Sequence, residues 1–266
     1  MAKYLLTAVA LIVLPLLGIM LAELPVGQYF EFPPVTRYVR HAAYSRPAFM
    51  AYLGFIVAVM APVLYRMVLS ALTVRRVPED AYPFPWWGWL GLTAGVVFWI
   101  LAWTRFSWFS QFQFYTFVPL WLCYILLVNA LVYRRQGGCM LTAGPGFFLI
   151  LFPVSAAFWW FFEYLNRYVQ NWYYTGIDLS PLEYVVYATV AFSMVLPAVL
   201  GTREWIRSFH WVDRGFSSWV RIDFSRFATV LASVVLIIGM AGLTTVGIWP
   251  DYLFAMLWVS PVFILV

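Results

Sequence analysis

Charge is the scarcest property of this sequence. Only 10% of its 266 residues are charged, while 64% are hydrophobic. In soluble globular proteins about a quarter of the residues are charged and about half are apolar. A soluble domain of this length could not bury so much apolar surface, so the solvent around most of the chain must be lipid. The composition therefore excludes a soluble protein and predicts an integral membrane protein whose first partner is the lipid bilayer.

Histidine and cysteine are almost absent. His41 and His210 are the only histidines, and they fall in loops predicted on opposite sides of the membrane, which rules out one bis-histidine haem within the bilayer under that topology. Two histidines are also too few for a histidine-rich di-iron cluster. Cys123 and Cys139 form no CxxC or Cys/His pattern, so neither a disulfide framework nor a zinc site is predicted. The chain alone supports no haem or metal site, and its cofactor is unknown.

Several functional motifs are missing as well. The sequence contains no GxxxxGK[ST] phosphate loop, no nucleophile elbow and no HExxH run. ATP-driven transport by this chain alone is therefore unsupported. The formal net charge of +5 does not indicate nucleic-acid binding, because the basic residues are scattered through short loops, where they act as topology signals.

Apolar runs of a length that can cross, or nearly cross, a bilayer occur eight times. They predict an all-α fold, a polytopic transmembrane bundle of about seven to eight helices, forming one membrane domain over residues 1–266. The first run is expected to stay as an uncleaved helix, because Ala22-Glu23-Leu24 matches a signal-peptidase site poorly. The last is short, so it is either a re-entrant or interfacial piece or the natural chain continues beyond it. The runs are Leu5–Ala22, Ala48–Leu72, Trp87–Trp103, Phe112–Val132, Gly146–Phe162, Tyr184–Leu200, Phe227–Val246 and Tyr252–Val266.

The connections between the runs predict the orientation. Ten basic residues fall on the side of the N-terminus and five on the other side, with Arg66 inside the second run left out of the count. By the positive-inside rule the N-terminus is cytoplasmic, in the cell inner (cytoplasmic) membrane. The outer loop 23–47 contains four prolines and cannot be one helix. The inner loop 201–226 alternates Trp and Phe with charges, which predicts a segment lying in the headgroup layer.

The most informative stretch begins at the outer end of the fifth run. Glu163, Asn166, Arg167 and Gln170 have helical spacing and are expected to share one inward-facing side of a continuous helix. Glu163 and Arg167 are spaced as a helical ion pair. Polar groups at the membrane edge are typical either of a binding site or of a structural network.

A second acid follows after a short loop. Ser180 and Pro181 can open the sixth helix, and Glu183 then lies in its first turn, where the helix dipole favours a carboxylate. Glu183 is therefore either a cap residue or the second acid of a site. The candidate catalytic residues are Glu163, Glu183 and Arg167, and the candidate binding residues are Asn166, Gln170, Asn171 and Trp172.

The run Trp172-Tyr-Tyr-Thr-Gly176, followed by Ser180-Pro-Leu-Glu-Tyr184, resembles the membrane lycopene cyclase-like domain over about 15 residues. In that family a Pro-x-Glu-Glu motif opens the helix, whereas here Tyr184 replaces the second Glu. The resemblance implies protonation of an apolar polyene by a carboxylic acid, followed by ring closure among aromatic faces. The stretch Phe161–Tyr174 is also similar to uncharacterised bacterial polytopic membrane proteins.

Two functions of different class remain open. One is a non-catalytic subunit of a larger membrane complex, which packs helices and could hold a lipid, carotenoid or quinone. The other is a membrane-embedded enzyme that modifies isoprenoids or lipids, with Glu163 and Glu183 as acid and base and Arg167 tuning them. Whether the protein is an enzyme is thus left open, and a convergence of both acids on one enclosed cavity would favour the second function.

Overall fold

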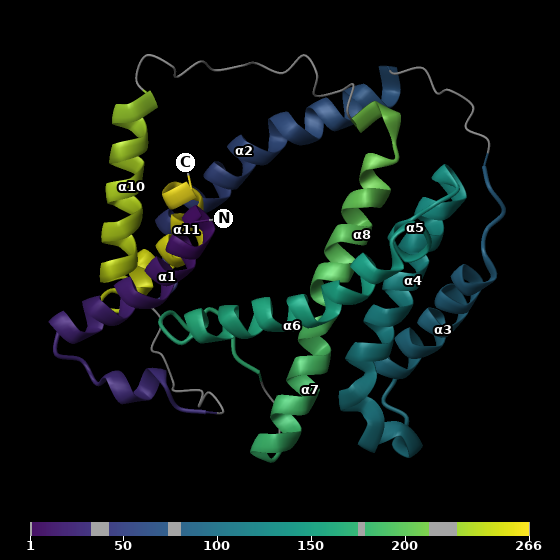
Figure 1. Ribbon diagram of the computed structural model, residues 1–266, viewed down its shortest axis with the longest axis horizontal. Helices are drawn as coiled ribbons and strands as arrows, with labels where there is room; N and C mark the ends of the chain where they lie inside the picture. Colours follow the sequence, from purple (N-terminus) through teal and green to yellow (C-terminus); the bar gives the residue numbers. More distant parts are fainter. Residues whose placement is uncertain (1, 33–42, 74–80, 175–178, 213–227, 266) are drawn as a thin grey trace. The chain divides into compact units, whose positions relative to one another are not determined.

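The computed structural model describes residues 2–32, 43–73, 81–174, 179–212 and 228–265. The fold is all-α, with no strand in those ranges (Figure 1). Among the described residues, seven helical segments are long and apolar enough to cross a membrane, and an eighth apolar helix, α11, is shorter. The prediction of a polytopic helical membrane protein with about seven to eight spans is confirmed.

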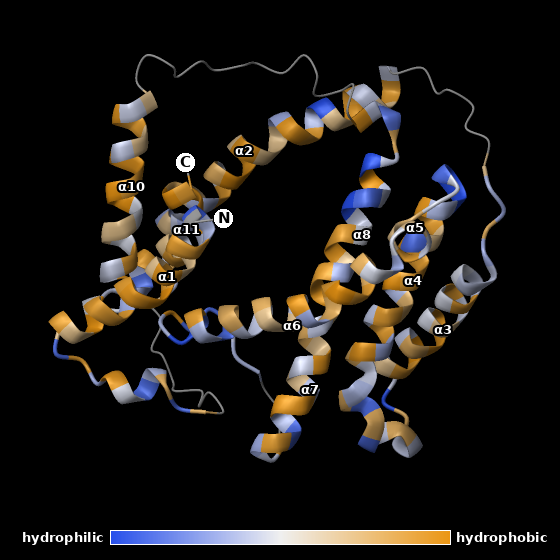
Figure 2. Cartoon of the chain, in the orientation of Figure 1, coloured by the Kyte–Doolittle hydropathy of each residue, from blue (hydrophilic) through white to orange (hydrophobic). Residues whose placement is uncertain are grey.

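Hydrophobic residues predominate along most of these helices (Figure 2), and many of their large apolar side chains are exposed. A helix that is apolar all round belongs in lipid or in a large core. The elements are α1 (Ala2–Leu21), η1 (Val26–Tyr29), α2 (Arg46–Thr73), α3 (Trp86–Trp103), η2 (Ser107–Thr116), α4 (Phe117–Gln136), α5 (Met140–Ala143), α6 (Pro145–Asn166), α7 (Pro181–Ser193), α8 (Val195–Arg207), α10 (Ala228–Thr245) and α11 (Pro250–Leu265).

The chain forms two compact units. The first combines Met1–Tyr44, Phe161–Val185 and Arg221–Val266, and so contains α1, α10, α11 and the end of α6. The second combines Ser45–Trp160 and Val186–Val220, and contains α2 to α5, most of α6 and α8.

Small residues bring the helices of the first unit together. A Cβ on Gly18 of α1 would overlap the carbonyl oxygen of Thr244 in α10, and one on Gly242 would overlap the side chain of Met256 in α11. Membrane helices associate through this kind of close backbone approach, because lipid provides no hydrophobic force between them. Ile19, Leu243 and Leu257 have no exposed surface; they form the core together with Leu11, Tyr29, Leu165, Tyr168, Val169 and Val246.

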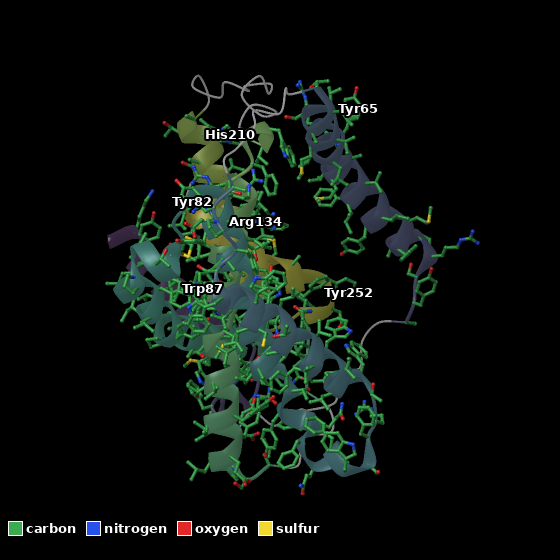
Figure 3. All side chains as sticks on the ribbon, turned by 90° about the vertical axis from the view of Figure 1, so that its right-hand side faces the viewer. Tyr65, Tyr82, Trp87, Arg134, His210 and Tyr252 are labelled. Atoms are coloured by element: carbon green, nitrogen blue, oxygen red, sulfur yellow. The ribbon has the colours of Figure 1, made fainter. Side chains whose placement is uncertain are left out.

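In the second unit, glycines of α3 pack against α4. A Cβ on Gly91 would come 2.9 Å from Cβ of Leu126 and 3.0 Å from the carbonyl oxygen of Cys123. Aromatic rings gather at the Arg134 end of α4, where Tyr82 and Trp87 both contact Tyr133; Figure 3 labels Tyr82, Trp87 and Arg134. A hydrogen bond from the Ser70 hydroxyl to the Trp211 carbonyl joins the C-terminal end of α2 to the segment that follows α8.

The sixth span is broken into α7 and α8. Pro197 lies in the first turn of α8 and has no N–H to donate to the preceding turn. The buried hydroxyl of Ser155, on α6, enters the gap: it donates to the Phe192 carbonyl at 2.6 Å and accepts the N–H of Leu196 at 3.0 Å. A side chain of α6 thus satisfies two of the backbone groups at the break, the Phe192 carbonyl and the Leu196 N–H.

One predicted boundary of the inner loop is wrong, and the predicted course of this loop falls mostly outside the described residues. The inner loop was expected to begin at Gly201, but α8 continues to Arg207. The charged residues after Leu200 are good helix formers, and helix continues through them. Residues 213–227 lie outside the described ranges, so the expected course of that loop along the membrane surface stays a prediction.

Candidate functional site

The candidate site lies where α6 ends, in the first unit. The prediction of a continuous helix through Gln170 is wrong, because α6 ends at Asn166 and Gln170 has a left-handed backbone with φ of 45°. The Asn166 side chain causes this redirection. Its Oδ1 accepts the N–H of Asn171 at 2.8 Å, and its Nδ2 donates to the carbonyl of Trp172 at 2.8 Å. Backbone bonds continue as one turn, up to the Gln170 N–H, which donates to the Asn166 carbonyl, and the Asn166 side chain then holds the residues that follow.

The returning loop lays its aromatic residues over Glu163. The indole N–H of Trp172 donates to Oε1 of Glu163 at 2.8 Å, and the hydroxyl of Tyr174 donates to the same oxygen at 2.6 Å. Glu163 is only 5% exposed. Two donors to one buried carboxylate oxygen compensate for its loss of water and fix the loop at the same time.

Helix α11 adds a further layer to this arrangement. The indole N–H of Trp258 donates to Oδ1 of Asn171 at 2.7 Å, and its ring stacks on Phe162 and lies against Trp172. We call Glu163, Asn166, Asn171, Trp172, Tyr174 and Trp258 the Glu163 cluster. The first four of these residues are candidates predicted from the sequence, whereas Tyr174 and Trp258 were not predicted.

Arg167 turns to a different partner than expected. The ion pair with Glu163 is not formed; within the described residues, Arg167 donates from Nη1 to the carbonyl of Tyr29 at 2.6 Å. The Tyr29 ring stacks on Tyr168 with centroids 4.8 Å apart, and the Tyr168 and Tyr164 hydroxyls share a hydrogen bond of 2.7 Å. Burial raises the pKa of the Tyr29 phenol, and burial followed by the bond to Tyr164 raises the pKa of Tyr168. Both phenols therefore stay protonated.

Glu183 forms a helix cap. Its Oε2 accepts the backbone N–H of Ser180 at 2.9 Å and the Ser180 hydroxyl at 2.7 Å, while the Ser180 Oγ accepts the N–H of Glu183 at 3.4 Å. This reciprocal pattern is a capping box at the start of α7. The structure thus brings Glu163, Asn166, Asn171 and Trp172 into one network, while Arg167 bonds towards η1, Glu183 bonds within its own turn, and Gln170 forms the bend.

No protein-family model matches the chain, and comparisons with curated proteins and with solved structures also found no match. The roles of these residues therefore have to be inferred from their geometry.

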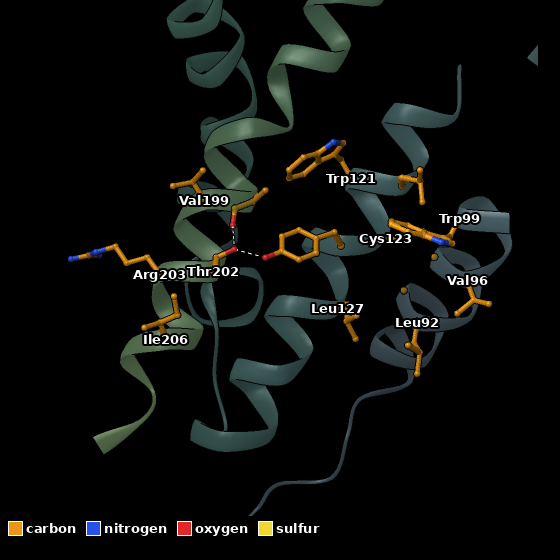
Figure 4. Close-up of a pocket in the computed structure, with 15 residues that line it drawn as sticks. Leu92, Val96, Trp99, Trp121, Cys123, Leu127, Val199, Thr202, Arg203 and Ile206 are labelled. Carbon is orange, nitrogen blue, oxygen red and sulfur yellow. Dashed lines mark hydrogen bonds between the residues drawn. The ribbon is translucent and has the colours of Figure 1, made fainter. Parts of the chain in front are cut away.

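A cavity in the second unit was missed by the sequence analysis. It has a volume of about 790 Å³ and lies between α3, α4 and α8 (Figure 4), and we call it the α3–α4–α8 groove. Two of its lining residues, Tyr124 and Thr202, share a 2.6 Å hydrogen bond between their hydroxyls. The signal that could have found it is the short glycine series Gly91 and Gly95, one turn apart, which leaves part of one side of α3 without side chains.

Proposed function

We propose that the protein is a non-catalytic subunit of a larger complex in the cell inner membrane, where it packs helices against partner chains and holds a lipid-like molecule. The observation that carries the proposal is the state of the two acids. Each carboxylate is bound by local donors, Glu163 by Trp172 and Tyr174 and Glu183 by Ser180. A general acid must present its proton to a substrate. These acids instead hold a loop and cap a helix.

Helix α2 supports the assembly part of the proposal. It has 28 residues, about 42 Å at 1.5 Å per residue, and among its described side chains only Ser70 is buried. Gly54 and Ala58 lie one turn apart on it, and a Cβ on Gly54 would meet nothing within 4 Å. Small residues at this spacing let a second membrane helix approach closely. We take a transmembrane helix of a partner subunit as the occupant of this face.

The test is extraction of the protein with its native membrane into nanodiscs, followed by native mass spectrometry. The wild type is expected to carry a partner chain in fixed ratio. Gly54→Leu should release that chain, because the larger side chain fills the contact. Val59→Phe is the matched control on the opposite side of α2 and should retain it. A protein that runs alone, or a companion that both variants retain equally, would refute the assignment of this face.

The alternative is an isoprenoid- or lipid-modifying enzyme of lycopene cyclase-like type. One observation favours it: Glu163 is a buried acid between aromatic rings, the setting that polyene protonation requires. Incubation of the reconstituted protein with an acyclic polyene tests it. Ring formation that Glu163→Gln abolishes, with the helical fold retained, would replace the subunit proposal.

A further inference from the structure

The α3–α4–α8 groove is a hollow between membrane-spanning helices, and its lining is almost entirely apolar. The volume of about 790 Å³ falls within the roughly 300–1,000 Å³ of small-molecule sites. Trp99, Trp121 and Val199 lie towards one end, and Leu92, Leu127 and Ile206 towards the other (Figure 4). From Val199 to Ile206 the groove follows α8 for about two turns, roughly 10 Å. Such a hollow accommodates a hydrocarbon chain running along the helices.

The depth of the groove comes from missing side chains. Gly91 and Gly95 line it from α3. Gly91 is needed for helix contact, but a Cβ on Gly95 would come no closer than 3.4 Å to Cβ of Cys123, which is ordinary contact. The space beside Gly95 can therefore be filled by substitution without forcing α3 away from α4.

The few polar groups of the lining indicate which kind of polar headgroup the ligand has. Thr202 donates its proton to the Ala198 carbonyl at 2.7 Å, so Tyr124 donates to Thr202 across the groove. Both hydroxyl protons are used, and neither is left for a quinone or carotenoid oxygen. The one charged residue of the lining is Arg203, which is exposed and extends from α8 away from α4 (Figure 4). A cation on a long stem at the edge of an apolar groove fits an anionic headgroup.

We propose that the α3–α4–α8 groove binds one anionic phospholipid, with its phosphate at Arg203 and an acyl chain along Gly95 towards Trp99 and Trp121. This inference rests on one part of the proposed function, that the protein holds a lipid-like molecule, and it names where that lipid binds. The assembly of partner chains does not depend on it.

The experiment uses the full chain in nanodiscs of phosphatidylcholine containing one fifth phosphatidylglycerol, with bound lipid counted by native mass spectrometry. The wild type is expected to retain one phosphatidylglycerol molecule. Arg203→Gln should weaken the affinity for phosphatidylglycerol by roughly five-fold and so lower the retained fraction, because one basic residue at the membrane surface contributes about 1 kcal/mol to anionic lipid binding. Arg207→Gln, one turn further along α8 and outside the lining, is the matched control and should retain the lipid.

Gly95→Leu should abolish retention by filling the groove while the protein stays monodisperse and helical. Inorganic phosphate in the buffer should not displace the lipid, because the chain supplies most of the contact. Equal retention of phosphatidylcholine and phosphatidylglycerol, an isoprenoid or quinone in place of the phospholipid, or full retention by Gly95→Leu would overturn the proposal. The mass of any partner chain is recorded in the same spectra, so loss of lipid and loss of assembly are scored separately.

Discussion

The Glu163 cluster and the α3–α4–α8 groove differ in what they do with polar groups. In the cluster, an acid, two amides and three aromatic residues bond to one another until each has a partner. The groove is lined by apolar side chains, one hydroxyl pair and one arginine. The candidate residues of the cluster thus bond to one another and to the backbone around them, while the cavity of the second unit lies where side chains are missing. In a membrane protein, polar residues near the bilayer are costly unless paired, so structural pairing is their first use.

The largest effect is expected from Glu163→Ala in the cluster. It removes a buried carboxylate and with it the shared acceptor of the Trp172 N–H and the Tyr174 O–H, which should cost about 3 kcal/mol of unfolding free energy. Glu163→Gln keeps an acceptor oxygen and should cost about 1 kcal/mol. Unfolding of the detergent-solubilised protein, followed by tryptophan fluorescence, measures both. Glu183→Gln is the control at an exposed cap and should have a smaller effect. Equal unfolding free energies for all three variants would contradict a structural role for the Glu163 cluster.

A smaller loss is expected from Gly91→Ala beside the groove. Its new Cβ would press on Leu126 and on the Cys123 carbonyl, which should destabilise the second unit by about 1–2 kcal/mol. Gly95→Ala is the matched control, because its Cβ has room and alanine favours helix by up to about 1 kcal/mol over glycine. The same unfolding measurement separates the two. If Gly95→Ala lowered the unfolding free energy more than Gly91→Ala does, Gly95 would be a helix-packing residue. It could then not be the residue that leaves space in the groove.

The smallest effect is expected from Tyr124→Phe. The variant removes the hydroxyl that bonds Thr202 and keeps the ring, so it should cost about 0.6 kcal/mol, the average of such bonds between membrane helices. Phosphatidylglycerol retention should stay at the wild-type level, since the phenol proton serves Thr202 and not the lipid. A loss of lipid larger than that of Arg203→Gln would move the headgroup from the arginine to the hydroxyl pair.

The membrane spans could be predicted from the sequence because an apolar run is a local property. The prediction for α3, Trp87–Trp103, differs from the observed Trp86–Trp103 by one residue. The end of α6 could not be predicted in the same way. The spacing of Glu163, Asn166, Arg167 and Gln170 fits a helix, yet Asn166 bonds to the backbone of Asn171 and Trp172 and ends it. Periodicity describes which residues would share a face if the helix continued, and it contains no information on a competing side-chain bond.

Four of the six residues of the Glu163 cluster were candidates in the sequence, and their contacts were predicted only in part. Asn171 and Trp172 lie beside Glu163 as a local loop return would place them, whereas Trp258 comes from α11, 87 residues further along the chain than Asn171. Contacts of that kind follow from tertiary packing and leave no local pattern. The groove was missed for a related reason, because a volume depends on three helices together and only the glycine series on α3 marks it in the sequence.

The Ser155 hydroxyl has a consequence for how this sequence can vary. It takes the place of a backbone hydrogen bond in a different helix, where it donates to the Phe192 carbonyl and accepts from the Leu196 N–H. Serine and threonine are the small side chains that can do both, so position 155 is restricted as long as Pro197 keeps the span broken. A lineage that replaced Pro197 could close the helix and would free position 155 for alanine. Among related chains the two positions should therefore change together, although they are far apart in the sequence and belong to different helices.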